Sequence, residues 1–223
     1  MIGSSPIVLF DLDGTLINTK RLYIECYREA VLPYVGRELS AEEVLALRPR
    51  SEIRFLRDVV GESRLRECMA DFHRAYARLH DEHFRGIYPG VPELLSSLRE
   101  AGLTLGIVTG KSRRSWELTT VRPALGAFDV LVFDDDVQEP KPDPEGLRLA
   151  LDRLGAGARS AVYVGDSQAD MEAAAAAGVR PIAALWAKKP DRRDAFLADV
   201  RRFEPIALNE PAELLKVLGV AAK

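Results

Sequence analysis

The feature that most constrains this chain is the segment Phe-Asp-Leu-Asp-Gly-Thr at 10–15, which directly follows the apolar run at 7–9. This short run, rich in aliphatic residues, predicts a buried strand, and the glycine predicts a turn where the strand ends. Asp11 and Asp13 are therefore expected at one strand end. Two carboxylates at this spacing can serve one cation, or can divide nucleophilic attack and proton transfer between them. A solvated acidic turn is the alternative for this segment taken alone.

Three further polar clusters each follow an apolar stretch. They are Thr109-Gly110-Lys111 after 105–108, Asp134-Asp135-Asp136 and then Lys141 after 130–133, and Gly165-Asp166-Ser167 with Asp170 after 161–164. Strands that alternate with helical segments predict an α/β fold with a Rossmann-like parallel sheet. Ligands of such sheets bind outside the carboxyl ends of the strands, so the four clusters predict one convergent site.

The residue types at these strand ends suit a phosphate group and a divalent cation. Asp11, Asp13 and Asp166 are hard oxygen donors, too few to enclose Ca²⁺ but suited to Mg²⁺. Thr109 and the backbone amides near Gly110, at an expected helix start, suit phosphate oxygens. The expected cofactor is therefore Mg²⁺, and the expected partner is a small phosphorylated molecule.

Lys141 supplies a positive charge that balances a phosphoryl group against the neighbouring carboxylates. Together with the acidic motifs and Thr109, Lys141 makes the chain resemble the haloacid dehalogenase superfamily of aspartate-nucleophile phosphatases. The resemblance covers nearly the whole chain and rests on four motifs in family-like order and spacing: Asp11-Leu12-Asp13-Gly14-Thr15, then Thr109, then Lys141, then Gly165-Asp166-Ser167 with Asp170.

The resemblance implies a role for each matching residue. Asp11 would be the catalytic nucleophile, and Asp13 the general acid and base. Thr109 would bind the phosphoryl group, and Lys141 would hold both that group and Asp11. Mg²⁺ would be bound by the carboxylates of Asp11 and Asp166 and by the main-chain carbonyl of Asp13.

The resemblance also implies a supporting role for Asp170, beside the metal-binding residues. Because dehalogenases of the superfamily lack the second acid, Asp13 favours phosphoryl transfer over dehalogenation. One position departs from the common pattern: many relatives carry an acid where this chain has Asn18. An amide can donate and accept hydrogen bonds but cannot act as a base, so any role of that acid is in doubt here.

Residues 19–84 have helical periodicity throughout, and they resemble the helical cap that many superfamily members insert after the first motif. We therefore expect a catalytic core formed by 1–18 and 85–223, with a cap formed by 19–84. Two hinges are expected near 16–20 and 84–88. A lid of this kind would exclude water while the phosphoryl group is transferred.

Within the expected cap, Arg48 and Arg50 are candidates for contacts with the substrate. A guanidinium group can bind a carboxylate or a second phosphate in a bidentate manner, although both residues are equally compatible with a solvated surface. His73, His80 and His83 lack the spacing of a metal site, so solvent-facing or helix-capping roles are expected for them. The acidic run at 134–136 is expected to be a solvated turn or to lie near the metal.

Composition excludes several classes of function. The net charge of −3 over 223 residues gives no electrostatic footprint for nucleic acid. No apolar stretch is long enough to span a membrane, and the N-terminus lacks the features of a signal peptide. Cys26 and Cys68 are expected to be reduced structural thiols. We expect a cytoplasmic protein, either a monomer or a homodimer.

The expected function is hydrolysis of a small phosphate monoester, through an aspartyl-phosphate on Asp11. Resemblance favours phosphoglycolate as the substrate because of the cap type, the Thr109-Gly110-Lys111 motif and the Lys-Pro-Asp-Pro segment at 141–144. Inorganic pyrophosphatase and sugar-phosphate phosphatase are alternatives within the same subgroup. A phosphomutase and a non-catalytic binding module are the further alternatives.

Overall fold

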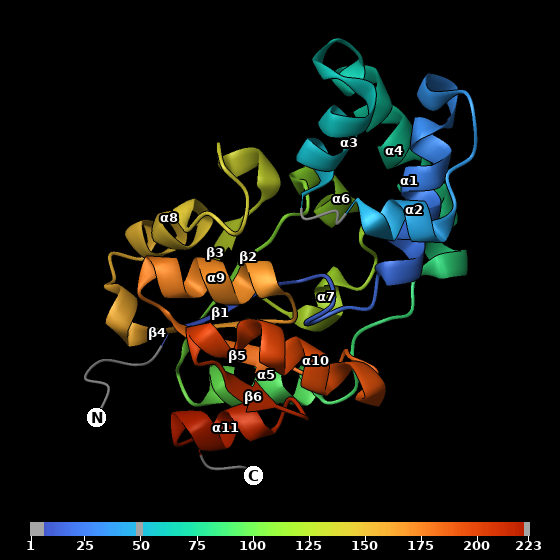
Figure 1. Ribbon diagram of the computed structural model, residues 1–223. Coiled ribbons are helices and arrows are strands. Elements are labelled where there is room, and N and C mark those ends of the chain that lie inside the picture. The colour runs from blue at the N-terminus through green and yellow to red at the C-terminus, as the bar shows by residue number, and fades with distance from the viewer. Residues whose placement is uncertain (1–6, 48–50, 221–223) are drawn as a thin grey trace.

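The computed structural model describes residues 7–47 and 51–220, and its centre is a six-stranded parallel sheet of order β3-β2-β1-β4-β5-β6 (Figure 1). The strands are β1 (Ile7–Phe10), β2 (Thr104–Val108), β3 (Val130–Val132), β4 (Ala161–Gly165), β5 (Arg180–Ala184) and β6 (Ile206–Leu208). This sheet, with its helices, confirms the predicted Rossmann-like α/β fold.

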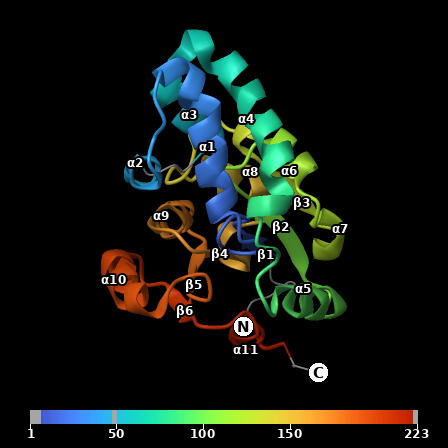
Figure 2. The ribbon, with the colours of Figure 1, turned by 90° about the vertical axis from the view of Figure 1, so that its right-hand side faces the viewer.

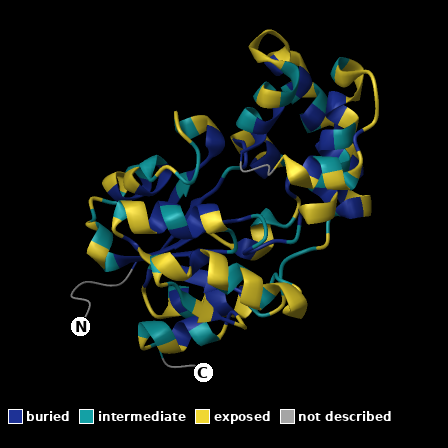
Figure 3. Ribbon diagram, in the orientation of Figure 1, coloured by how far each residue is buried: buried dark blue, intermediate teal, exposed yellow. Residues whose placement is uncertain are grey.

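Helices cover both faces of the sheet. Val8 and Phe10 of β1 pack with α5 (Val91–Glu100) and α11 (Glu213–Leu218). Ile7 and Leu9 point to the other face, where they pack with α8 (Glu145–Arg153) and α9 (Gln168–Ala177). Because both faces are covered, β1 is apolar at every position, and Figure 3 shows the strands as the buried layer of the molecule.

The other helices of this part of the chain lie beside the sheet or connect its strands. They are α6 (Arg113–Leu118), α7 (Arg122–Leu125), α10 (Pro190–Val200) and the 3₁₀ helices Asp134–Asp136, Ala158–Ser160 and Arg201–Phe203. The sequence predicts one helix over 112–125, interrupted near Pro123, whereas α6 already ends at Leu118. The helix ends before Thr119, where the backbone becomes extended.

Four helices form a second packed unit, which we call the α1–α4 bundle. They are α1 (Lys20–Val35), α2 (Ala41–Ala46), α3 (Glu52–Val60) and α4 (Glu62–His83). The bundle has its own apolar core, which includes Phe72 and Tyr76, and α2 begins with a capping box formed by Ser40 and Glu43. Figures 1 and 2 show it as a separate lobe beside the sheet.

Two chain segments connect the bundle to the sheet, and they are hydrogen-bonded to each other. The amide of Asn18 donates to the carbonyl of Gly86 at 2.9 Å, and the amide of Arg85 donates to the carbonyl of Asn18 at 3.1 Å. Ile17 and Ile87 form a further antiparallel bridge. The predicted hinge segments therefore lie side by side.

Two histidines of α4, expected to face the solvent or to cap a helix, do not face the solvent. His80 and His83 lie in the last turn of α4, and both are buried. The ring of His80 packs against Phe84, with the ring centroids 4.6 Å apart, where α4 meets the connecting segment. Helical spacing alone did not predict the burial of these two histidines. Cys26 and Cys68 are free and buried, as expected. No helix within 7–47 or 51–220 is long and apolar enough to cross a membrane.

Gly106 in the middle of β2 provides a test of the sheet packing. A Cβ at this position would lie 2.4 Å from Cγ1 of Val130 and 2.6 Å from Cδ2 of Leu9. We expect Gly106→Ala to lower the free energy of unfolding by about 1–3 kcal/mol because the neighbouring strands must shift. Gly157→Ala, where a Cβ meets nothing within 4 Å, is the matched control. Urea unfolding of both variants measures the difference, and equal stabilities would contradict the packing described.

Candidate active site

The carboxyl ends of β1, β2 and β4 bring three predicted site residues together. The register pairs Phe10 with Ile107 on one side and with Val164 on the other. Asp11, Thr109 and Asp166 each follow one of these adjacent strands. The predicted convergence is therefore a consequence of strand order.

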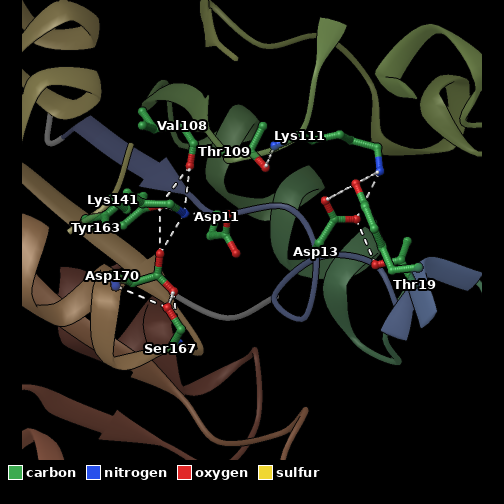
Figure 4. A network of polar contacts seen from close by, with 11 residues as sticks. Asp11, Asp13, Thr19, Val108, Thr109, Lys111, Lys141, Tyr163, Ser167 and Asp170 are labelled. Atoms are coloured by element: carbon green, nitrogen blue, oxygen red, sulfur yellow. Dashed lines mark hydrogen bonds and ion pairs between the residues drawn. The ribbon is translucent and has the colours of Figure 1, made fainter. Parts of the chain in front are cut away.

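Lys141 lies between two carboxylates at the centre of this site (Figure 4). Its Nζ donates to Oδ1 of Asp11 at 2.8 Å and to Oδ1 of Asp170 at 2.7 Å. The same ammonium donates to the hydroxyl of Tyr163 at 2.9 Å. Burial raises the pKa of Asp11, although the positive charge of Lys141 opposes the shift. Burial acts in the same direction on Asp170, but Lys141 and the hydrogen bonds from Ser167 hold its pKa below the usual value.

The start of α9 fixes the orientation of Asp170. Ser167 is the N-cap, and its hydroxyl and amide both donate to Oδ2 of Asp170, at 2.6 and 2.9 Å. A Cβ at Gly165 would lie 2.5 Å from Cβ of Asp170, so only glycine allows this approach. Oδ2 of Asp170 is thus bound by the capping box, while its Oδ1 faces Lys141.

Three carboxylates could together hold a divalent cation. One oxygen from each of Asp11, Asp166 and Asp170 lies within 4.8 Å of the others. Carboxylate oxygens are the ligands that Mg²⁺ prefers, so the residues fit the expected metal. Burial raises the pKa of Asp166, with the nearby ammonium of Lys188 at 3.4 Å acting against this shift. Asp170, expected only in a supporting role, lies within this group.

Gly14 allows the first motif to pack directly against Asp166. Its φ is +86°, and a Cβ there would lie 2.7 Å from Oδ1 of Asp166. A side chain at this position would be strained and would also displace a carboxylate of the candidate metal site.

The carboxylate of Asp13 has other partners than Asp11. It accepts hydrogen bonds from the hydroxyl of Thr19 at 2.8 Å and from Nζ of Lys111 at 3.2 Å, and the hydroxyl oxygen of Tyr23 lies 3.3 Å from its Oδ2. Figure 4 shows this carboxylate directed toward Thr19 and Lys111, away from Asp11. Lys111 belongs to the motif Thr109-Gly110-Lys111, but nothing in the motif predicted its contact with Asp13.

Thr109 and Gly110 lie in a short loop between β2 and α6. The amide of Thr109 continues the sheet by donating to the carbonyl of Val132 at 3.0 Å. Thr109, Gly110 and Lys141 line one small cavity, next to Asp134. The two residues predicted to bind phosphate thus share a cavity with the lysine.

The two cap arginines and the acidic run at 134–136 were also candidates for the site. Arg48 and Arg50 lie outside the described residues. Asp134 is buried, unlike a solvated turn, and accepts from the hydroxyl of Ser51 at 2.6 Å. Asp135 and Asp136 accept hydrogen bonds from Arg113.

Glu52 is a further buried carboxylate near this site, and none of the sequence motifs includes it. It is 1% exposed and accepts hydrogen bonds from the hydroxyl of Tyr23, from the amide of Ser112 at 3.1 Å and from the hydroxyl of Ser115 at 2.8 Å. Burial raises the pKa of this carboxyl to about 7, although the charge of Lys111 and these hydrogen bonds oppose the shift.

Comparison with known proteins assigns the family. The family described as haloacid dehalogenase-like hydrolase matches residues 8–184. Pyrophosphatase PpaX of Bacillus velezensis is 35% identical over 219 residues, covering 96% of this chain and 96% of that protein. Pyrophosphatase PpaX of Bacillus cereus is 36% identical over 184 residues, covering 82% of this chain and 84% of the relative.

Solved structures agree with this assignment. CbbY from Rhodobacter sphaeroides in complex with phosphate has a TM-score of 0.77 and 27% identity, covering 95% of this chain and 96% of that one. A candidate phosphoglycolate phosphatase from Lactobacillus plantarum has a TM-score of 0.75 and 25% identity, covering 96% and 99%. This chain belongs to the haloacid dehalogenase-like hydrolase family, and it is a phosphatase of that family.

The charge pairing around Lys141 makes a prediction about stability. The side chains of Lys141 and Asp11 are only 10% and 9% exposed, so Lys141→Met leaves two buried carboxylates without their cation. We expect the free energy of unfolding at neutral pH to fall by about 3–5 kcal/mol. Lys216→Met, at an exposed position of α11, is the control. Chemical denaturation without added metal measures both, and a loss no larger than that of the control would contradict this account of Lys141.

Proposed function

We propose that the protein is a Mg²⁺-dependent phosphatase that uses Asp11 as nucleophile and acts on pyrophosphate or a similarly small phosphate ester. The observation that carries the proposal is the position of Asp11. Its carboxylate is held by Lys141, belongs to the three-carboxylate group and lies at the strand end next to Thr109.

In the proposed first step, one carboxylate oxygen of Asp11 attacks phosphorus, and the bond from phosphorus to the leaving oxygen breaks. The product is an aspartyl-phosphate, which divides the overall hydrolysis into two easier transfers. Lys141 orients Asp11 and balances the negative charge of the phosphoryl group. Thr109 and the amide of Gly110 would bind the phosphoryl oxygens. Bound Mg²⁺ would supply further positive charge at this group, through Asp11, Asp166 and the carbonyl of Asp13.

Asp13 is the proposed general acid and base. It would protonate the leaving oxygen in the first step and take a proton from the attacking water in the second. In the second step water oxygen bonds to phosphorus and the bond from phosphorus to Asp11 breaks, so inorganic phosphate leaves and the Asp11 carboxylate is restored. The other product, released in the first step, would be the dephosphorylated alcohol or, for pyrophosphate, a second inorganic phosphate. Asp170 would orient Lys141 as it does in the structure.

We propose that residues 19–84, which include the α1–α4 bundle, form a cap domain. This cap would close on the catalytic core formed by residues 1–18 and 85–223. The paired connecting segments at 16–18 and 85–88 suit two hinges. Arg48 and Arg50 remain proposed contacts for the part of the substrate that leaves. We propose a cytoplasmic enzyme that is a monomer or a homodimer.

The relatives favour pyrophosphate as the first substrate to test. Two proteins named pyrophosphatase PpaX are 35% and 36% identical to this chain over most of its length. Phosphoglycolate, favoured by the sequence motifs, is the second candidate. It is supported by the structural likeness to the candidate phosphoglycolate phosphatase.

The test measures phosphate release from pyrophosphate, phosphoglycolate, sugar phosphates and nucleotides, with Mg²⁺ and with a chelator. We expect magnesium-dependent release that falls on the order of 10⁴-fold or more in Asp11→Asn, because the substitution removes the nucleophile. Asp199→Asn, an exposed carboxylate on α10, is the control and should retain wild-type activity.

Absence of release from every substrate, with folded and metal-loaded protein, would indicate a phosphomutase or a binding module. Conversion of a sugar phosphate into its isomer only with a trace of sugar bisphosphate would then identify the phosphomutase. Activity that survives Asp11→Asn would disprove the proposed nucleophile.

A further inference from the structure

Glu52, in the first turn of α3, connects the bundle to the loop that follows Thr109. Its backbone amide donates to the carbonyl of Gly110 at 3.0 Å. Its carboxylate accepts from the amide of Ser112 at 3.1 Å and from the hydroxyl of Ser115 at 2.8 Å. Ser112 is the N-cap of α6, so a carboxylate of the bundle satisfies free donors at the start of a helix that follows the sheet.

Asp134 makes the reciprocal contact. Its carboxylate accepts from the hydroxyl of Ser51, the N-cap of α3, at 2.6 Å and from the amide of Ile53 at 3.0 Å. Its own amide donates to the carbonyl of Lys111 at 3.0 Å. Each unit therefore contributes one buried carboxylate to the helix start of the other, and both contacts converge on the loop at 110–112.

Glu52 also contacts Lys111 indirectly, through the hydroxyl of Tyr23. The hydroxyl of Tyr23 donates to Glu52, and Nζ of Lys111 lies 2.7 Å from the same hydroxyl. That ammonium, on a fully buried side chain, also donates to Asp13 at 3.2 Å and lies 4.6 Å from the ring centroid of Tyr76. Burial lowers the pKa of Lys111, but the electrostatic interactions with Asp13, Tyr76 and Glu52 outweigh burial and leave the pKa raised, so the cation is retained.

We propose that Glu52 is a positioning residue for the reaction, which acts through Tyr23 and Lys111 to place the Asp13 carboxylate when the bundle is docked. Glu52 touches neither Asp11 nor the carboxylates of the candidate metal site, so its effect passes through Asp13. The inference rests on the proposed function, in which Asp13 transfers the protons. This role gives a reason for burying the Glu52 carboxylate between the bundle and the loop at 110–112. The same side chain then both docks the bundle and places Asp13.

Two roles of Glu52 can be distinguished: positioning Asp13, or only stabilising the docked bundle. The test compares kcat/KM for two substrates whose leaving groups differ in their need for a proton. Because kcat/KM covers only the steps up to formation of the aspartyl-phosphate, it reports protonation of the leaving oxygen. An alkyl phosphate such as phosphoglycolate needs that proton, whereas p-nitrophenyl phosphate has a good leaving group and needs it little. Loss of folded enzyme would lower both values by the same factor.

For Glu52→Gln we expect kcat/KM to fall on the order of 10- to 100-fold with the alkyl phosphate and by less than about 3-fold with p-nitrophenyl phosphate. Tyr23→Phe keeps the ring and removes only the hydroxyl, so it should show the same unequal loss. Glu67→Gln, an exposed position on α4, is the matched control and should change neither value. Equal losses on both substrates, or none, in Glu52→Gln and Tyr23→Phe would overturn the proposal.

Asp134→Asn tests the reciprocal contact, which does not reach Asp13. It loosens a contact that docks the bundle but leaves the contacts among Glu52, Tyr23 and Lys111 intact, so its unequal loss should be smaller than that of Glu52→Gln. An unequal loss as large as that of Glu52→Gln would contradict the assignment to Glu52.

Hydrogen exchange supplies a readout that does not depend on catalysis. In Glu52→Gln the amide of Ser112 should exchange faster than in the wild-type protein, and in Glu67→Gln it should not. Unchanged exchange would overturn the contact on which the inference is built. If Asp11→Asn retained activity while this exchange still rose, the proposed function would fail and the Glu52 contact would stand.

Discussion

The position of Lys141 between Asp11 and Asp170 is the interaction on which the rest of the site depends. Two buried carboxylates repel each other, and one ammonium within 2.8 Å of both compensates them. This arrangement needs β1 and β4 to be neighbours, because Asp11 follows the first strand and the helix bearing Asp170 follows the second. Strand order thus determines where charge can be buried.

The sheet and the core of the site could be predicted because they follow from local patterns. Apolar runs ending in polar residues identify strand ends, and parallel strands place those ends at one edge. Asp11, Thr109 and Asp166 lie together for this reason. The position of Asp170 followed from the family resemblance, and its capping box with Ser167 explains why it is held so firmly.

The contacts of Lys111, Tyr23 and Glu52 could not be predicted in the same way. Glu52 stands in the first turn of a helix, where a glutamate is already favourable for local reasons, so its sequence context gives no sign of burial. Its partners Ser112 and Ser115 lie about sixty residues away and belong to another unit. The same limit explains the buried Asp134, whose partners Ser51 and Ile53 lie about eighty residues away: partners distant in the sequence decide whether a polar residue is exposed.

Two buried lysines divide the charge of the site into two clusters with different supports. Lys141 joins Asp11 and Asp170, and all three belong to the part of the chain that forms the sheet and its covering helices. Lys111 joins Asp13 to Tyr23, whose hydroxyl reaches Glu52, and both of the latter belong to the α1–α4 bundle. Movement of the bundle would therefore leave the proposed nucleophile in place and change the surroundings of the proposed acid. Proton transfer is then the step that this architecture makes dependent on the bundle.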